Sequence, residues 1–512
     1  MPAAAPHSRP AAAAPGWLTR VRGVTAARVL LLTVIAAKAA DPVVDPDAFW
    51  HVATGKLILR THTIPKVDPF SWTAPGRAWV AHEWLIEIVF AVLHRLAGWP
   101  GLVVYAIVTI TAAWAIVGRT AQRLGASPGI TNLIVAVSAL SCIHTWGARP
   151  QMLSLLFGAL FADFMVQAWR GRPNVLWRCV PIMLLWCNAH GGYMFGISML
   201  FLFACALTTE RIVGRIAPRW RPEPHAMATS ALHRRAWTVV VCTAAVSLIN
   251  PNGVKGFLYP FSYLGDNAST RYVEEWFAPT FARLQWWPFF VLISLALITI
   301  RKSYRSLPAF VGVGMLVYGA LGVQSVRNIT QFSFFAAPWI ALAITRGMSA
   351  LRERSATVVP GTSKGSSPLR TVLPLAALIS ALSIAVINAG GLLPGPNATA
   401  QAVEFPVGAA AYLREHPTQN LYNTYDWGGY LILNLRQPVG IDGRPDMYGD
   451  AFVDRYVATW NLAPGWEQRL RDAKVKSVLA QINEPIAKKL RAPNSGWTVQ
   501  YEDRRAILFR RP

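Results

Sequence analysis

The sequence predicts a polytopic α-helical membrane protein with a small α/β domain at its C-terminus. Of its 512 residues, 53% are hydrophobic and only 14% are charged, which is too apolar for a water-soluble chain. Apolar runs near the length of a bilayer crossing, about 20 residues, recur along the chain. The clearest of these runs are Ala26–Ala40, Leu102–Gly118, Met152–Trp169, Tyr193–Leu207, Pro288–Ile300, Phe310–Val323 and Val372–Ile387.

The distribution of basic residues predicts how the chain crosses the membrane. Loops rich in Arg and Lys belong on the cytoplasmic side, and they alternate with basic-poor loops only if His82–Trp99 does not cross. That segment contains Glu83, Glu87, His94 and Arg95, and is predicted to lie as an amphipathic helix at the outer interface. We therefore expect about eleven transmembrane helices in the cytoplasmic (inner) membrane. The expected parts are a cytoplasmic tail (1–23), a transmembrane domain (24–389) with long outer loops (41–99 and 250–286), and an extracytoplasmic domain (390–512).

The C-terminal region is expected to form an α/β domain, because short alternating runs replace the long apolar ones after about residue 390. About 110 residues suffice for one small domain. The helix is predicted over Phe405–His416, and the strands over Asn420–Asn423, Val439–Asp442, Ser477–Ile482, Thr498–Tyr501 and Ala506–Phe509.

The net charge of +24 raises the question of nucleic-acid binding. Basic cytoplasmic loops explain this charge in a membrane protein. The most basic run, Arg211–Arg235, matches no nucleic-acid-binding motif. The lipid bilayer is therefore the predicted partner, and nucleic acid is not.

Ionisable side chains gather in the predicted outer loops, whereas the predicted cytoplasmic ends carry mainly Arg and Lys. Placing ionisable side chains at a membrane edge costs free energy, so their presence there indicates a function. Their asymmetry predicts a polar cavity that opens outward and contains both acids and cations. The candidates are Asp45, Asp47, His51, His82, Glu83, His144, Arg149, His190, Glu274, Glu275 and Arg327.

These residue types suit group transfer from a lipid phosphate. Arginine matches phosphate oxygens bidentately, which makes Arg149 and Arg327 candidates for binding an anionic leaving group. An acceptor hydroxyl needs a carboxylate to take its proton, and Asp45 and Asp47 are candidates. His51 lies four residues after Asp47, so the two would share a helix face.

Each candidate also has a purely structural alternative. Asp45 and Asp47 flank Pro46 and would serve as helix caps. The two arginines would extend toward the lipid interface. His82 and Glu83 would anchor the interfacial helix, and His190, which precedes two glycines, would satisfy backbone groups at a tight turn. The sequence alone leaves these alternatives open.

Several motifs resemble a known superfamily. They are "DPDAFWHVATGKLI", "IPKVDPFSWT", "WVAHEWLIE", "ARPQMLS", "WCNAHGGYMFG", "YNTYDWGGYLI" and "GIDGRPDMYG". Together with an Asp-containing first outer loop directly after the first helix, they resemble a bacterial branch of the GT-C superfamily, integral membrane glycosyltransferases that use polyprenyl-phosphate-linked sugars. The resemblance covers most of the chain.

The resemblance implies a hexosyl- or pentosyltransferase on the outer side of the cytoplasmic membrane, with a glycan, lipid or protein as acceptor. It implies that Asp47 is the catalytic base. Asp45 is the second candidate, and it would position the acceptor or bind a metal. Some members bind a divalent metal (Mg²⁺ or Mn²⁺) through such acids and others need none; Glu274 and Glu275 match the second acidic site by position only. The substrate-binding candidates are His51, His82, Glu83, Arg149, His190 and Arg327.

Two features leave other functions open. Outward arginines would also suit a transporter or flippase of lipid-linked saccharides, although pseudo-repeated broken helices, typical of transporters, are absent from the sequence. A non-catalytic cell-envelope assembly scaffold would keep the fold and bind through its C-terminal domain. In that domain, Asp442 and Arg444 either bind an acceptor or pair with each other.

Overall fold

The protein was analysed as a computed structural model. It describes residues 16–216, 230–263, 265–303, 306–356, 389–435 and 437–511. Most of the predicted N-terminal tail, parts of the basic loops 211–235 and 346–370, and the apolar run Val372–Ile387 lie outside the described residues.

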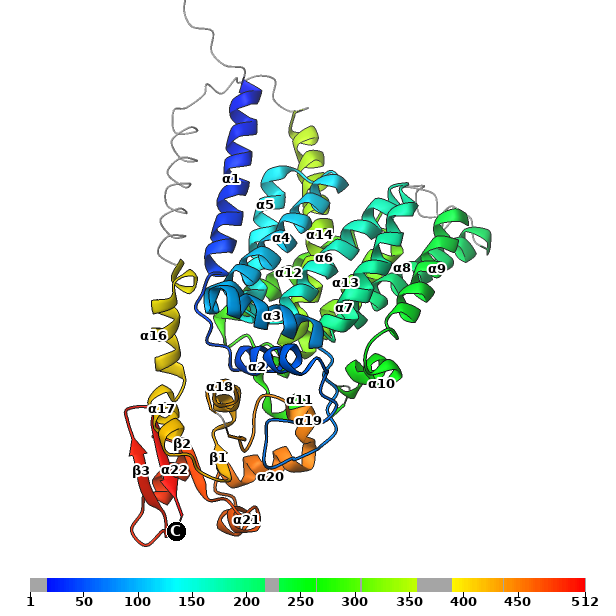
Figure 1. Cartoon of the computed structure of the whole chain (residues 1–512). Helices are drawn as coiled ribbons and strands as arrows, with labels where there is room; N and C mark the ends of the chain where they lie inside the picture. The colour runs from blue at the N-terminus through cyan, green and yellow to red at the C-terminus, as the bar shows by residue number, and fades with distance from the viewer. Residues whose placement is uncertain are drawn as a thin grey trace, which may run out of the picture.

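Long helices run side by side as a bundle (Figure 1). Six of the described helices are long and apolar enough to cross a membrane: Trp99–Leu124, Pro128–Thr145, Gln151–Trp169, Tyr193–Ile216, Leu284–Ser303 and Val326–Glu353. The protein is therefore a multi-pass membrane protein. The bundle helices are α1 (Gly16–Lys38), α4 (Trp99–Leu124), α5 (Pro128–Cys142), α6 (Gln151–Trp169), α7 (Cys179–Ala189), α8 (Tyr193–Ile216), α9 (Ser230–Val246), α12 (Trp287–Ser303), α13 (Ala309–Gln324) and α14 (Ile329–Ala356).

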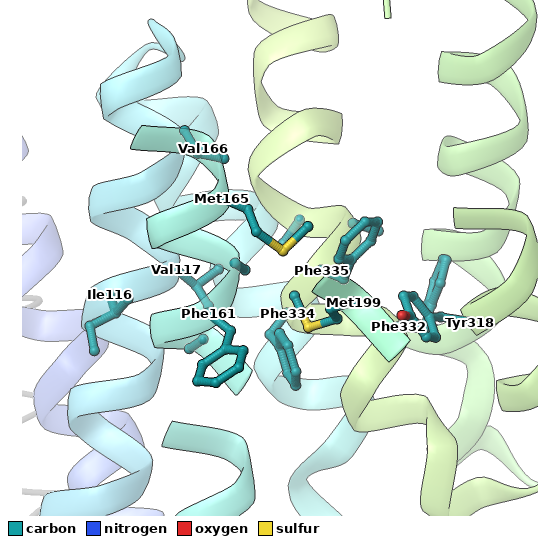
Figure 2. Packing of buried hydrophobic residues seen from close by; sticks show 14 of the residues in the cluster. Ile116, Val117, Phe161, Met165, Val166, Met199, Tyr318, Phe332, Phe334 and Phe335 are labelled. Carbon is teal, nitrogen blue, oxygen red and sulfur yellow. The ribbon is translucent and has the colours of Figure 1, made fainter. Parts of the chain in front are cut away.

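The bundle core combines large aromatic residues with glycines on neighbouring helices. Figure 2 shows Phe334 and Phe335 of α14 among the buried side chains of the helices around them. A Cβ on Gly158 would lie 2.4 Å from Phe334, and one on Gly314 would lie 2.5 Å from Phe335. Small residues at these positions let the helices pack closely, as is common within membranes.

Helices α2 (Pro46–Thr61) and α3 (Trp84–Ala97) lie across one end of the bundle (Figure 1). The helix predicted within His82–Trp99 is thus confirmed, and it is not among the six helices long enough to cross. The two helices touch at Gly55, where a Cβ would lie only 1.9 Å from the carbonyl oxygen of Glu87. This close approach places His51 on α2 against Glu87 on α3.

The C-terminal region contains a four-stranded sheet of order β1-β2-β4-β3. Strands β1 and β2 are parallel, and the other two pairs are antiparallel. The strands are β1 (Leu421–Asn423), β2 (Ser477–Gln481), β3 (Thr498–Glu502) and β4 (Ala506–Arg510), and the helices are α16 (Pro394–Glu404), α17 (Val407–Glu415), α18 (Gly428–Asn434), α19 (Pro445–Tyr448), α20 (Asp450–Trp460), α21 (Trp466–Asp472) and α22 (Pro485–Leu490).

The predicted helix and four of the five predicted strands are confirmed. The strand predicted over Val439–Asp442 is wrong: Val439 forms only an isolated bridge, with Ser71 of the first outer loop. The amide of Gly440 donates instead to the Asn423 side chain (2.8 Å). The Asn423 side chain thus accepts the hydrogen bond that a neighbouring strand would accept if this segment were part of the sheet.

The first outer loop packs into the C-terminal region. Trp72 donates from its indole Nε1 to the carbonyl of Leu421 (2.8 Å). On α2, Phe49 is fully buried against the rings of Phe405 and Tyr430. The N-terminal and C-terminal parts of the chain therefore share one apolar core at this end of the bundle.

The second outer loop completes this end of the molecule. It contains α10 (Gly253–Leu258) and α11 (Ala268–Tyr272), followed by a 3-10 turn over Glu274–Trp276. The amide of Ala268 donates to Asp450 (2.7 Å) at the start of α20, and Arg271 pairs with Asp454 (2.9 Å). The loop is thereby held between the bundle and the C-terminal region.

Candidate active site

A cavity of about 700 Å³ lies where the two outer loops, the bundle and the C-terminal region meet. All eight residues predicted for catalysis or substrate binding line it: Asp45, Asp47, His51, His82, Glu83, Arg149, His190 and Arg327. His144, Glu274 and Glu275, also noted in the sequence, line it as well. The structure thus brings together residues that lie up to 282 positions apart (45 to 327).

Asp47 lies in the first turn of α2, and Asp45 caps that helix. The amide of Asp47 donates to Asp45 Oδ1 (2.8 Å), and Pro46 fits the first helical position. Asp47 Oδ1 in turn accepts a hydrogen bond from Trp50 Nε1 (2.9 Å). The capping alternative therefore holds for Asp45, whereas the Asp47 carboxylate lies on the cavity.

The C-terminal region closes over Asp47 through Gly443. A Cβ on Gly443 would lie 2.0 Å from Asp47 Oδ1, so glycine is needed for this approach. Burial, with smaller contributions from Asp442 and Asp426, raises the pKa of Asp47 to about 6 against the opposing effect of the Trp50 hydrogen bond. A carboxyl group with a pKa near neutral pH is suited to taking up and releasing a proton.

The two predicted phosphate-binding arginines lie near each other and share one carboxylate. Arg149 forms ion pairs with both Asp45 and Glu275. Arg327 reaches Glu275 at 4.0 Å, and its guanidinium lies 5.1 Å from the centre of the Trp276 ring. Burial lowers the pKa of Arg149 to about 10, and it stays charged at neutral pH. Both arginines line the cavity. They therefore do not extend toward the lipid interface, as the structural alternative would require.

Glu83 lies among three histidines. Its Oε1 is 3.7 Å from His82 Nε2 and 3.6 Å from His190 Nε2, and its Oε2 is 3.6 Å from His51 Nε2. The other ring nitrogen of His51 lies 3.2 Å from Glu87 Oε1. Burial raises the pKa of Glu83 to about 8, so this carboxyl group keeps its proton at neutral pH.

The hydrogen bonds assign where the protons of two histidines lie. His190 Nδ1 accepts from the amide of Gly192 (2.9 Å), so its proton is on Nε2, which faces Glu83. His82 Nδ1 donates to the carbonyl of Val80 (3.2 Å), so the Nε2 that faces Glu83 is an acceptor. At 3.6–3.7 Å these Nε2 atoms lie close to Glu83 but beyond hydrogen-bond distance. The rings are held instead by the bonds of their Nδ1 atoms, and their convergence on Glu83 was not revealed by their spacing in the sequence.

The C-terminal wall of the cavity was not assigned from the sequence. Its residues are Tyr425, Asp426, Gly443, Arg444, Pro445 and Asp446. The signals that would have found them are the motifs "YNTYDWGGYLI" and "GIDGRPDMYG", which are among those that carry the family resemblance. Asp446 accepts a hydrogen bond from Tyr259 (2.7 Å), and this bond links the wall to the second outer loop.

Arg444 and Asp442 pair with each other, which was one of the two roles that the sequence left open for them. Arg444 donates to Asp442 (2.6 and 2.7 Å) and to Asp68 of the first outer loop (2.8 Å). Its guanidinium lies 4.5 Å from the centre of the Trp79 ring. With 2% of its surface exposed, Arg444 fixes the first outer loop against the C-terminal wall.

The prediction of a divalent metal stays a prediction. Among the residues that the structure describes, no group of three or more His, Cys, Asp or Glu side chains is arranged to hold a metal ion. Asp45 already neutralises Arg149 and caps α2, so the Asp45–Asp47 pair does not offer two free carboxylates.

No protein-family model and no curated protein matches the sequence. Solved structures do match the fold. The oligosaccharyltransferase AglB from Archaeoglobus fulgidus, in complex with an inhibitory peptide and a dolichol-phosphate, has a TM-score of 0.59 at 10% identity, over 91% of this chain and 70% of that chain. The same organism's oligosaccharyltransferase tethered to an acceptor peptide has a TM-score of 0.56 at 12% identity, with the same coverage.

A further structure, ArnT from Cupriavidus metallidurans bound to undecaprenyl phosphate, has a TM-score of 0.47 at 15% identity, over 97% of this chain and 98% of that chain. At these identities the likeness concerns the fold, and it rests on the archaeal structures. It agrees with the resemblance that the sequence motifs indicate. This chain therefore has the fold of the GT-C-type membrane glycosyltransferases.

Proposed function

We propose that the protein is an inverting glycosyltransferase that moves a sugar from a polyprenyl-phosphate-linked donor to an acceptor on the outer side of the cytoplasmic membrane. The observation that carries the proposal is the single cavity in which a carboxylate with a near-neutral pKa, Asp47, lies with two arginines. The fold and the lipid phosphates bound to the structural neighbours support it.

In this proposal Asp47 is the general base. Asp47 takes the proton of an acceptor hydroxyl while the acceptor oxygen bonds to the anomeric carbon of the sugar. The bond from that carbon to the phosphate oxygen breaks, and the electron pair stays on the phosphate. Arg149 and Arg327 stabilise the charge that develops there. Asp45 holds Arg149 in place.

The rest of the cavity suits a sugar. Aromatic rings and further carboxylates line the cavity, and they offer flat apolar faces together with acceptors for sugar hydroxyls. The aromatic residues are Trp50, Trp79, Tyr259, Tyr263, Tyr272, Trp276 and Tyr425. Experiment must decide whether the acceptor is a glycan, a lipid or a protein, and whether the sugar is a hexose or a pentose.

We also propose the membrane arrangement that the charge pattern predicts. The crossings are the six long apolar helices, the further helices α1, α7, α9 and α13, and the run Val372–Ile387, which lies outside the described residues. This makes eleven, with the cavity and residues 390–512 on the outer side. Cysteine labelling from either side of sealed vesicles, at His62 and at Arg119, tests the orientation.

Replacement of Asp47 tests the function. In Asp47→Asn, transfer of sugar from a polyprenyl-phosphate donor is expected to fall by about 10²–10⁴-fold, because the proton acceptor is gone while the Trp50 hydrogen bond can remain. The matched control is Asp41→Asn, an exposed acid paired with Lys38. Full activity of Asp47→Asn in folded protein would sink the proposed role.

Three further measurements test the base, the metal requirement and the alternative functions. Wild-type rates should rise with pH through about 6, since Asp47 must lose its proton before it can act. Transfer assays in EDTA, repeated after Mg²⁺ or Mn²⁺ is restored, test whether activity requires a divalent metal. If lipid-linked saccharide crosses vesicle membranes without sugar transfer, the flippase alternative replaces the proposal; if neither occurs, the scaffold alternative does.

A further inference from the structure

Glu275 lies at the position that an anion would take between the two cavity arginines. Its Oε1 pairs with Arg149, and its Oε2 lies 4.0 Å from Arg327. Its side chain is 24% exposed and faces the cavity. A carboxylate that bridges two guanidinium groups uses the same donors as a phosphate oxygen pair would use.

The backbone around Glu275 is fixed, so only its side chain is free to leave. Ser325 donates from its hydroxyl to the carbonyl of Glu275 (2.9 Å), and the amide of Val326 donates to the carbonyl of Phe277 (2.9 Å). These bonds attach the 3-10 turn to the residues just before Arg327. Rotation of the Glu275 side chain would open the anion position without moving the loop.

The arginines keep other contacts if Glu275 rotates away. Arg149 retains its ion pair with Asp45. Arg327 retains its position over Trp276, whose ring also stacks on Tyr263 at 5.3 Å and 11°. Both donors therefore stay oriented toward the same point, ready for another anion.

We propose that Glu275 is a resident anion of the phosphate site, which a phosphate group must displace to bind and which returns when the phosphate leaves. The inference rests on the proposed function and adds to it a residue that sets the site's affinity for phosphate. With Asp45 and Glu275 present, two carboxylates balance two arginines. Removal of the Glu275 charge leaves one positive charge for the incoming anion.

Binding to the full-length protein in zwitterionic nanodiscs tests the inference. The probes are undecaprenyl phosphate and inorganic pyrophosphate, which separate a lipid head group from a soluble phosphate. Glu275→Gln should lower the Kd for phosphate by about tenfold, because the competing charge is lost. Glu404→Gln, the same change at an exposed carboxylate outside the cavity, should alter the Kd by less than about twofold. In Glu275→Gln combined with Arg327→Gln, the gain should disappear.

A gain in affinity cannot arise from damage to the fold, so tighter binding supports the inference. If the wild type binds undecaprenyl phosphate and Glu275→Gln binds neither probe more tightly, displacement is wrong and the proposed function stands. If no variant binds either probe, both fail. If only pyrophosphate binds, and Glu275→Gln binds it more tightly, the displacement holds but the lipid-phosphate donor is wrong.

Discussion

Two arginine clusters near the outer cavity use the same residue types in opposite ways. Arg444 is almost fully buried; Asp442, Asp68 and aromatic rings surround it. Arg149 and Arg327 have side chains that are 24% and 33% exposed, and they share Glu275. The Arg444 cluster is closed and joins two distant parts of the chain. The Arg149–Arg327 cluster is open, so its partner can be exchanged.

The difference shows that partner count and exposure separate a structural ion pair from a candidate ligand site. A buried arginine with two carboxylates has no reason to release either, because each would be left unpaired away from water. An arginine at a cavity wall can replace one anion by another at little cost. The following variants should break or sharpen this contrast, from the largest effect to the smallest.

The largest effect is expected for Arg444→Ala. It leaves Asp442 and Asp68 buried without a counter-ion, which costs roughly 3–5 kcal/mol of unfolding free energy. Thermal unfolding in detergent, followed by size-exclusion chromatography, measures the loss. The control is Arg505→Ala at the exposed pair with Glu404 (3.2 Å), where less than about 1 kcal/mol is expected. Equal losses in the two variants would erase the contrast.

Arg327→Gln should leave the fold intact and weaken function. The Kd for undecaprenyl phosphate should rise by about tenfold. The charge of Arg327 also lowers the pKa of Asp47, so its removal should move the acid limb of the activity profile above pH 6. Arg149→Gln serves as the comparison: we expect it to weaken binding with a smaller shift of that limb, since Asp45 neutralises Arg149. Identical shifts would contradict this assignment.

The last variant, Glu83→Gln, is expected to change the pH dependence of stability and is compared by slope. Burial raises the pKa of Glu83 from 4.5 to about 8, so the folded state holds a proton that the unfolded chain releases above pH 4.5. This contribution to stability is complete below about pH 4.5 and is lost as the pH rises toward 8, by at most about 1.4 kcal/mol per pH unit. The variant should unfold with a flatter pH dependence between pH 5 and 8.

The control for that measurement is Glu415→Gln, since Glu415 is exposed at the end of α17. It should leave the slope as in the wild type. A Glu83→Gln variant with the same pH dependence of stability as the wild type would contradict the protonated state assigned to Glu83.

The sequence predicts a helical membrane protein and many of the residues that line the cavity, because both follow from local signals; the count of eleven crossings stays a prediction. Apolar length and loop charge mark crossings, and the acids after the first helix mark the outer site. The interfacial helix was predicted from four ionisable residues within His82–Trp99, and α3 lies within those limits.

What the sequence does not reveal comes from contacts between distant residues. Gly443 touches Asp47, and no local pattern signals this approach. Val439–Asp442 alternates like a strand, but the Asn423 side chain takes the amide of Gly440. The histidines were predicted to bind substrate, and only the fold shows their nitrogens converging on Glu83.

The bond between Arg444 and Asp68 joins residues 376 positions apart. At about 5–20 residues per second, the ribosome needs roughly 20–75 s to supply the second partner after the first. During that interval the catalytic candidate Asp47 is already made, but the wall that covers it is not. A nascent chain therefore reaches the membrane before this wall of the cavity exists, and a chain cut short before residue 444 would lack the contact that fixes the wall to the first outer loop.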